Sequence, residues 1–240
     1  MLRTLLFVVV AALCTDVAAT TLFVSSDIGH EMTVVNRADV SGSHLDHNKY
    51  DVYPLRDDSL DAAFVNDVLQ LATKASPRLE IFRFKLGADA SLDEAADDVL
   101  VSRALERVRD VAPGDRILVI LPHRLPIRFT VLNGFAGTGK AAGLGAYIDR
   151  DRDWTADDRD NDPAGTIAMF VNYRILIIDP SARKIVFSDE IATGEARSGG
   201  NGSGGSPWDA LTPVQKLELL KTLVATSLDK SLTPQLTSMQ

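Results

Sequence analysis

The feature that most constrains the fold is an unbroken apolar run, Arg116 to Leu121 (RILVIL), near the middle of the chain. Its length is that of a β-strand, and a strand without polar alternation has to be covered on both faces. Two segments predicted to be amphipathic helices precede it, with a predicted strand between them. This alternation of helix and strand is typical of a layered α/β sheet whose helices are crossovers.

The two predicted helices have recognisable starts and ends. The first begins after Asp58 and ends at Ser76-Pro77, and its apolar stripe consists of Leu60, Phe64, Val68 and Leu71. The second begins with a capping box at 91–94 and ends before Pro113-Gly114, and its stripe consists of Leu92, Ala96, Val99, Leu100, Leu105 and Val108. The segment between them, 78–86, alternates as a strand does.

Short strands are also predicted at both ends of the domain. The early ones cover 21–25, 31–37 and 50–53, and the later ones, with no helix between them, cover 127–132, 143–149, 166–178 and 184–188. A turn at 179–182 joins the last two. The sheet is therefore expected to be mixed, parallel in its middle and antiparallel at one side.

The C-terminal part has a different composition. Residues 198–206 (SGGNGSGGS) have the composition of a flexible linker. After it, Thr212 to Gln215 is a good helix start, and a stripe for docking follows at Leu217, Leu220, Val224 and Leu228. The expected organisation is one α/β domain with a mixed sheet over 20–197, the linker at 198–206, and a C-terminal helical segment over 207–240.

The first 19 residues have the order of a secretory signal peptide. Arg3 gives a positive start, Thr4 to Leu13 is apolar, and Val17-Ala18-Ala19 is a small-residue cleavage site. The apolar stretch is about half of the 20 residues that a membrane-spanning helix needs. We therefore expect a soluble protein, exported to the periplasm or secreted after cleavage near Ala19, with no transmembrane segment in the mature chain. An uncleaved anchor is the alternative.

The cysteine count and the charge exclude several classes of protein. The single cysteine, Cys14, lies within the leader, so the mature chain is expected to have no disulfide and no thiolate ligand. Lipidation at Cys14 is an alternative, although Leu13 does not suit lipoprotein processing. The net charge of −8 disfavours nucleic acid as a partner.

A glycine-rich segment, Gly134 to Lys140, fits the spacing of a phosphate loop. Ala141 stands where a hydroxyl should hold magnesium, and Gly143 and Gly145 stand where the phosphate-binding helix should begin. We therefore expect no bound nucleotide and predict a mobile loop between strands, beside a possible ligand site.

An aspartate-rich segment has the ligand spacing of a calcium loop, with candidate ligands Asp149, Asp151, Asp153, Asp157 and Asp160. Trp154 replaces the usual glycine, and nearby arginines would neutralise the carboxylates. A solvated charged loop is therefore the favoured interpretation and calcium the alternative; no cofactor is required. His44, Asp46 and His47, with His30, form a weaker zinc candidate in a polar, turn-rich segment.

Polar residues follow two predicted strands that should be parallel neighbours. Ligands of open α/β sheets bind outside the carboxyl ends of such strands. The ends of 21–25 and 116–121 would bring together Ser25, Ser26, Asp27, His30, His123 and Arg124. Hydroxyl, carboxylate, imidazole and guanidinium groups suffice for acid–base or nucleophilic chemistry. Prolines flank His123, so a rigid surface turn is the alternative interpretation there.

Three short motifs carry a resemblance: Val24 to Gly29, Gly143 to Tyr147, and Tyr173-Arg174 leading to Asp179. In these motifs the chain is similar to exported bacterial proteins of unknown function. The resemblance implies export from a bacterial cell and adds no catalytic residue to those considered above.

Two functions remain open from the sequence. The first is a non-catalytic envelope protein that binds a small molecule or another envelope protein, since no strong catalytic motif is present. The second is an exported hydrolase of the phosphatase or esterase kind, with Ser25, Asp27, His30, His123 and Arg124 at its site.

Overall fold

The computed structural model describes residues 20–38, 47–55, 59–87, 95–131, 134–151, 165–199 and 206–239. The predicted signal peptide, residues 1–19, lies outside these residues. The helices are α1 (Ser59–Ala75), α2 (Asp97–Arg107), the 3-10 helix η1 (Pro207–Ala210) and α3 (Pro213–Thr237). The strands are β1 (Thr21–Ser26), β2 (Glu31–Asn36), β3 (Lys49–Pro54), β4 (Glu80–Arg83), β5 (Arg116–Pro122), β6 (Leu125–Pro126), β7 (Phe129–Val131), β8 (Gly134–Ala136), β9 (Lys140–Ala141), β10 (Gly143–Asp149), β11 (Thr166–Asp179) and β12 (Lys184–Ser198).

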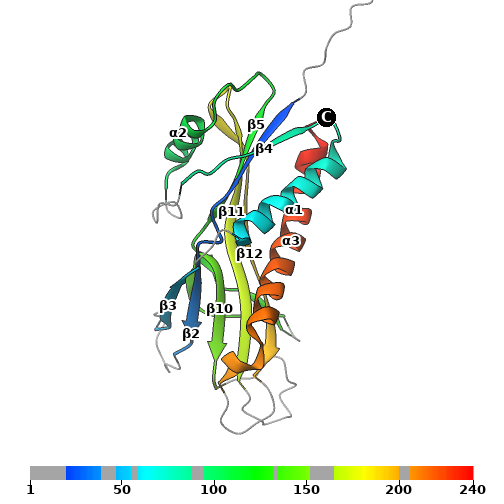
Figure 1. Ribbon diagram of the computed structural model, residues 1–240. Helices are drawn as coiled ribbons and strands as arrows, with labels where there is room; N and C mark the ends of the chain where they lie inside the picture. Colours follow the sequence, from blue (N-terminus) through cyan, green and yellow to red (C-terminus); the bar gives the residue numbers. More distant parts are fainter. Residues whose placement is uncertain are drawn as a thin grey trace, which may run out of the picture.

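The long strand β11 is the axis of a mixed sheet, and the α/β fold class predicted from the sequence is confirmed (Figure 1). One edge of β11 pairs with β12 along its whole length. The other edge pairs first with β10, up to Asn172, and then with β5, from Tyr173 onwards. The sheet therefore forks between Asn172 and Tyr173.

Most of the parallel pairs lie on the two branches of this fork, and a further one joins β7 to β12 at Thr130 and Glu195. On one branch β1 is parallel to both β4 and β5, as expected for strands 21–25 and 116–121. On the other branch β2 is parallel to β10 and antiparallel to β3. The expectation of a parallel middle was wrong, because β11 is antiparallel to each of its three partners.

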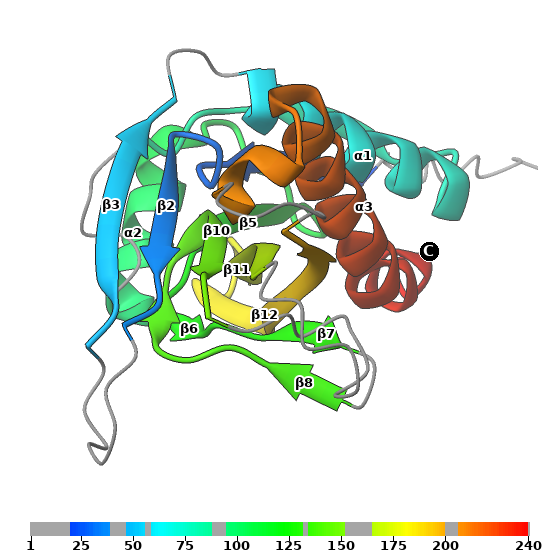
Figure 2. The same ribbon diagram turned by 90° about the horizontal axis from the view of Figure 1, so that it is seen from below.

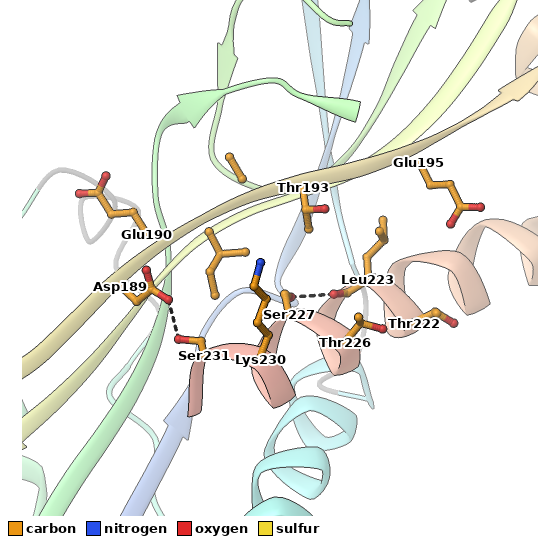
Figure 3. A pocket seen from close by; sticks show the side chains of 12 residues that line it. Asp189, Glu190, Thr193, Glu195, Thr222, Leu223, Thr226, Ser227, Lys230 and Ser231 are labelled. Atoms are coloured by element: carbon orange, nitrogen blue, oxygen red, sulfur yellow. Dashed lines mark hydrogen bonds between the residues drawn. The ribbon is translucent and has the colours of Figure 1, made fainter. Parts of the chain in front are cut away.

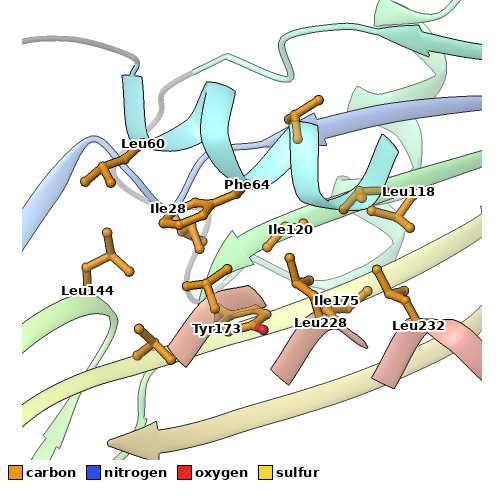
Figure 4. Close-up of a cluster of buried hydrophobic side chains, with 14 of the residues drawn as sticks. Ile28, Leu60, Phe64, Leu118, Ile120, Leu144, Tyr173, Ile175, Leu228 and Leu232 are labelled. Carbon is orange, nitrogen blue, oxygen red and sulfur yellow. The ribbon is translucent and has the colours of Figure 1, made fainter. Parts of the chain in front are cut away.

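Helices α1 and α3 cover one face of the sheet, and α2 covers the opposite face of the β1–β5 branch (Figures 1 and 2). The largest core lies under α1 and α3, where Phe64 and Leu228 pack with Tyr173 and Ile175 of β11 (Figure 4). Val119 and Leu176 point the other way, into the core under α2. A third core around Phe129, Tyr147 and Phe170 lies beside β7. The RILVIL strand is thus buried on both faces, as its composition predicts.

The glycine-rich segment 134–140 leads into a strand. Residues 134–136 form β8, and β10 begins at Gly143 where a phosphate loop would begin a helix. The buried Asn172 side chain donates to the carbonyls of Leu125 and Ala141, at 3.0 and 2.9 Å. These bonds fix the small β6–β9 ribbon against the main sheet.

Two predicted elements differ from those observed. Helix α2 begins at Asp97 with Ala96 as an N-cap that makes no side-chain hydrogen bond, while the predicted capping box at 91–94 lies outside the described residues. Val99 is 47% exposed, and Val101 and Ala104 are buried instead, so part of the predicted stripe was wrong. Strand β12 continues ten residues past the predicted end at Ser188, because β11 supplies a partner for that whole length.

The C-terminal helix begins at the predicted start with a capping box, in which Thr212 and Gln215 bond each other's backbone amides. Its buried stripe includes the predicted Leu220, Val224 and Leu228 and extends to Leu236. Residues 200–205 of the predicted linker lie outside the described part of the chain. Of the described helices, none combines the length and the apolar character that crossing a membrane would require.

Candidate functional site

The candidate site lies where the chain passes from one branch of the forked sheet to the other. Strand β1 ends at Ser26, and the amide of Asp27 still bonds the carbonyl of Ile120 on β5, at 3.0 Å. The chain then turns through Ile28 and Gly29 to His30 and enters β2 on the other branch. The turn therefore sits at the carboxyl end of a parallel strand pair, where α/β sheets bind ligands.

The first turn of α1 supplies the floor of this site. Asp61 Oδ1 accepts hydrogen bonds from Ser26 Oγ at 2.7 Å and from the Gly29 amide at 3.0 Å. A carboxylate is favoured at this end of a helix by the helix dipole. Gly29 permits the close approach, because a Cβ there would lie 2.9 Å from both the Asp61 amide nitrogen and Leu60 Cβ.

A second carboxylate, Asp27, lies at the start of the turn and is bonded to Ser25 at the end of β1. Ser25 Oγ donates to Asp27 Oδ2 at 3.4 Å and accepts from the Leu86 amide at 3.1 Å. Asp27 and Ser25 are both buried. The chain after β4 is thereby tied to the end of β1 beneath the site.

His30 lies between the two carboxylates. Its Nε2 is 3.3 Å from Asp27 Oδ1 and 3.6 Å from Asp61 Oδ2. Asp61 Oδ2 is buried and has no hydrogen-bond partner among the described residues. Burial raises the pKa of the Asp61 carboxyl, although the bonds from Ser26 and Gly29 and the nearby imidazole oppose the shift.

A cleft of about 440 Å³ opens beside these groups. Asp27, His30 and Asp61 line one part of it. Arg83, the last residue of β4, and Lys85, which follows this strand in the chain, line another part. The remaining wall is largely apolar and consists of Ala62, Val65 and Phe84. Such a cleft combines an acidic floor, a basic rim and an apolar wall, the mixture by which small-molecule sites orient a ligand.

The hydrogen bonds limit the chemistry of the two serines. A hydroxyl has one proton, and both serines donate theirs to a carboxylate, Ser25 to Asp27 and Ser26 to Asp61. Neither proton is directed to the imidazole, as activation of a serine nucleophile by histidine requires. Neither serine is therefore positioned as a histidine-activated nucleophile.

The structure brings Ser25, Ser26, Asp27 and His30 together but places His123 elsewhere. His123 Nε2 is 3.3 Å from Glu190 Oε1 on β12. Glu190 lies directly opposite Arg174 in the β11–β12 ladder, and the Arg174 side chain bonds Asp97 of α2. The side chains of His123, Glu190 and Arg174 therefore lie on the α2 side of the sheet. His30 contacts α1 on the opposite side. Arg124 is exposed beyond His123.

The calcium candidates are only partly described. Asp149 is fully buried; its Oδ2 accepts from Arg37 Nη1 at 2.7 Å, and its Oδ1 accepts from the Asp151 amide at 3.0 Å. A calcium ion would have to compete with that guanidinium. Asp153, Asp157 and Asp160 lie outside the described residues, as do His44 and Asp46 of the zinc candidate. Among the residues that are described, no group of three or more acidic, histidine or cysteine side chains has a metal-binding arrangement.

Asp61 was not among the residues that the sequence singled out, although a pattern for it exists. It precedes Val65 and Val68 by four and seven residues, which places it on the buried stripe of α1. A carboxylate on an apolar helix face requires polar partners. The sequence does not say that those partners are Ser26 and Gly29, since 35 and 32 residues separate them.

No protein-family model matches the sequence, and no curated protein matches it significantly. One similar solved structure is described as a homolog of the neuraminyllactose-binding hemagglutinin, from Helicobacter pylori: 10% identity, TM-score 0.42, covering 92% of this chain and 87% of the other. A Xanthomonas campestris protein of family model DUF330 has 11% identity and a TM-score of 0.30, covering 92% and 80%. A hypothetical protein from Chlamydia trachomatis has 11% identity and a TM-score of 0.31, covering 90% and 99%. These likenesses to bacterial proteins are weak and assign no ligand or activity to this chain.

Proposed function

We propose that this chain is an exported, non-catalytic binding protein whose cleft at the end of β1 holds a small zwitterionic molecule. The observation that carries the proposal is the Ser25–Asp27 and Ser26–Asp61 pairing, which uses both hydroxyl protons within a rigid cleft floor. Export is supported by the leader-like order of residues 1–19.

The charges of the cleft favour a ligand with both a positive and a negative group. An ammonium group would find Asp27 beside His30, and a carboxylate or phosphate would find Arg83 and Lys85 at the rim. The apolar wall at Val65 and Phe84 suits a short hydrocarbon part. A ligand of one charge alone would leave half of this lining uncompensated.

Thermal unfolding of the purified full-length gene product tests the binding proposal. The probes are zwitterionic amino acids, short dicarboxylates and simple amines, each at millimolar concentration. A ligand at 100 times its Kd stabilises the native state by about 2.7 kcal/mol, so at least one zwitterion should raise the Tm. Asp27→Asn should weaken its binding at least tenfold, and Asp98→Asn, on the exposed side of α2, should not. Equal shifts in both variants, or shifts with single-charge probes only, contradict the proposal.

The same protein sample separates binding from hydrolysis. The contact between His30 and Asp27 is the feature that favours an esterase or phosphatase, because it would orient an imidazole for proton transfer. We expect no turnover of p-nitrophenyl acetate or p-nitrophenyl phosphate above the buffer rate. Turnover that His30→Gln abolishes would replace the binding protein by a hydrolase. Intact mass tests export separately, because cleavage after Ala19 leaves Thr20 as the first residue.

A further inference from the structure

The outer edge of β12 is a long strand edge with little strand pairing. β11 occupies one side of β12 throughout, from Lys184 to Ser198. On the other side, the described residues supply a single strand pairing, between Glu195 and Thr130 of β7. Long unpaired edges are normally shortened, bulged or covered, because they can pair with another chain.

The regular part of this edge runs from Phe187 to Thr193. A bulge at Val186 interrupts the register toward the turn, where Ile177 is paired with Phe187 and Ile178 with Ile185. At the other end Gly194 is closed off, since its Cα lies so close to the Arg128 carbonyl that a Cβ would be 2.7 Å away. Seven residues of strand span about 23 Å, which is enough for an added strand of ordinary length.

A groove of about 680 Å³ follows this edge, between β12 and α3 (Figure 3). Asp189 and Ser231 mark one end, where the serine donates to the carboxylate at 2.6 Å. Thr222 and Thr226 are exposed on α3 one turn apart and also line the groove. The groove therefore offers side-chain hydroxyls next to a strand edge, and its volume accommodates several side chains.

Carboxylates outnumber cationic groups along this edge. Asp189 and Glu195 lie on the α3 side of β12 together with the ammonium group of Lys230, whereas Glu190 points to the α2 side, toward His123 (Figure 3). Arg197 is ion-paired with Glu195, Ser231 donates to Asp189 and His123 contacts Glu190, so three carboxylates stand against the two permanent cations Lys230 and Arg197. An incoming segment with lysine or arginine side chains complements this lining and the net charge of −8 of the chain.

A second copy of this chain is a poor occupant. Antiparallel pairing of two Phe187–Thr193 edges has its centre at Glu190, so that each Glu190 would lie opposite its copy. Like charges directly opposite each other destabilise an antiparallel pair. From the edge, the groove and this charge pattern, we propose that β12 binds an extended basic segment of another protein by strand addition, with its side chains in the β12–α3 groove.

Selection of a displayed library of random ten-residue peptides on the purified full-length gene product tests this proposal. We expect the enriched peptides to carry lysine or arginine at alternate positions and to lack proline. The Kd of the best peptide is then measured by fluorescence anisotropy. Replacing two successive central residues of that peptide by proline should weaken binding at least tenfold, because one of the two amides must face β12.

Two matched variants locate the peptide on the protein. Thr226→Trp fills the groove from an exposed helix position and should weaken binding at least tenfold. Val214→Trp is the control, because Val214 is 68% exposed at the start of the same helix and does not line the groove. Binding that ignores Thr226→Trp, survives both prolines, or yields acidic peptides overturns the proposal. So does a dimer in sedimentation that Thr226→Trp dissociates. Asp27→Asn should leave the peptide's Kd unchanged, which keeps this result separate from that of the cleft.

Discussion

The cleft at the end of β1 and the groove beside β12 are built in opposite ways. The cleft is assembled from four separate parts of the chain: the end of β1, the turn before β2, the start of α1, and the end of β4 with the residues after it. The polar groups of its floor, Ser26, Asp27 and Asp61, are buried and hydrogen-bonded. The groove is formed by two continuous elements, β12 and α3, and most of its lining is at least partly exposed.

The difference separates stability from recognition. A buried polar network is costly to disturb, because each broken bond leaves a buried donor or acceptor without a partner. An exposed groove tolerates substitution, because water can replace a hydrogen bond that a substitution removes. Substitutions in the cleft should therefore change folding and binding together, whereas those in the groove should change binding almost alone.

The largest expected change in the free energy of unfolding comes from a substitution in the hydrophobic core beneath α1 and α3, which lies next to both the cleft and the groove. Phe64 of α1 is fully buried and packs in the same cluster as Leu228 and Leu232 of α3 (Figure 4). Phe64→Ala should lower the free energy of unfolding by about 3–5 kcal/mol, measured by urea denaturation. A loss below about 1 kcal/mol would show that the two helices do not depend on a common core.

The next effect is at the turn of the cleft. Gly29→Ala places a Cβ against the Asp61 amide and Leu60, and it should cost about 1–3 kcal/mol while also weakening ligand binding. Denaturation and ligand titration of the same variant check both. Gly114→Ala is no suitable control, because Gly114 has φ +101° and strains any side chain. Gln70→Ala, at an exposed position on α1 that does not line the cleft, serves better and should be neutral.

The third prediction concerns the pH dependence of stability and distinguishes a carboxyl group buried in the cleft from an exposed one. Burial raises the pKa of Asp61 above the value of the unfolded chain, so the folded state holds this proton more tightly. The contribution of Asp61 to stability is therefore full below the unfolded pKa, about 3.9, and is lost as pH rises through the folded pKa. Asp61→Asn removes that loss.

Urea denaturation at pH 4 and pH 7 measures this effect. The free energy of unfolding of Asp61→Asn, relative to the unmodified protein, should be more favourable at pH 7 than at pH 4. The exposed control, Asp98→Asn, should show no such difference. An identical pH profile for Asp61→Asn and the unmodified protein would refute the raised pKa.

The smallest effect is in the groove. Ser231→Ala removes one partly exposed hydrogen bond to Asp189 and should cost about 0.5–1.5 kcal/mol, at the lower end because water reaches the carboxylate. Glu195→Gln should cost less still. Chemical denaturation measures both. A loss of more than about 3 kcal/mol in the free energy of unfolding of either variant would show that the groove depends on buried polar contacts, as the cleft does.

Much of the fold could be predicted from local patterns. The unbroken RILVIL run predicted a strand buried on both faces, and Thr212 with Gln215 predicted the start of α3, because apolar periodicity and capping act over a few residues. The length of β12 could not be predicted. Its polar residues Ser188, Asp189 and Glu190 resemble the end of a strand, and the partner that extends it is β11.

The candidate site was predictable only in part. The sequence placed Ser25, Asp27 and His30 at a strand end, and it added His123 because neighbouring parallel strands end at one edge of a sheet. It could not show that His123 contacts Glu190 on the α2 side of the sheet. Nor could it show that Asp61 is the residue that lies beside His30. Both depend on which face each side chain takes after the strand ends.

By itself the sequence determined the elements, the apolar faces and the residues that flank the strands, because these follow from spacings of two to four residues along one segment. The tertiary structure alone decided where the sheet forks, which carboxylate meets His30, and which strand keeps an open edge. These features depend on register and packing between segments distant in the chain, which spacings of two to four residues do not specify.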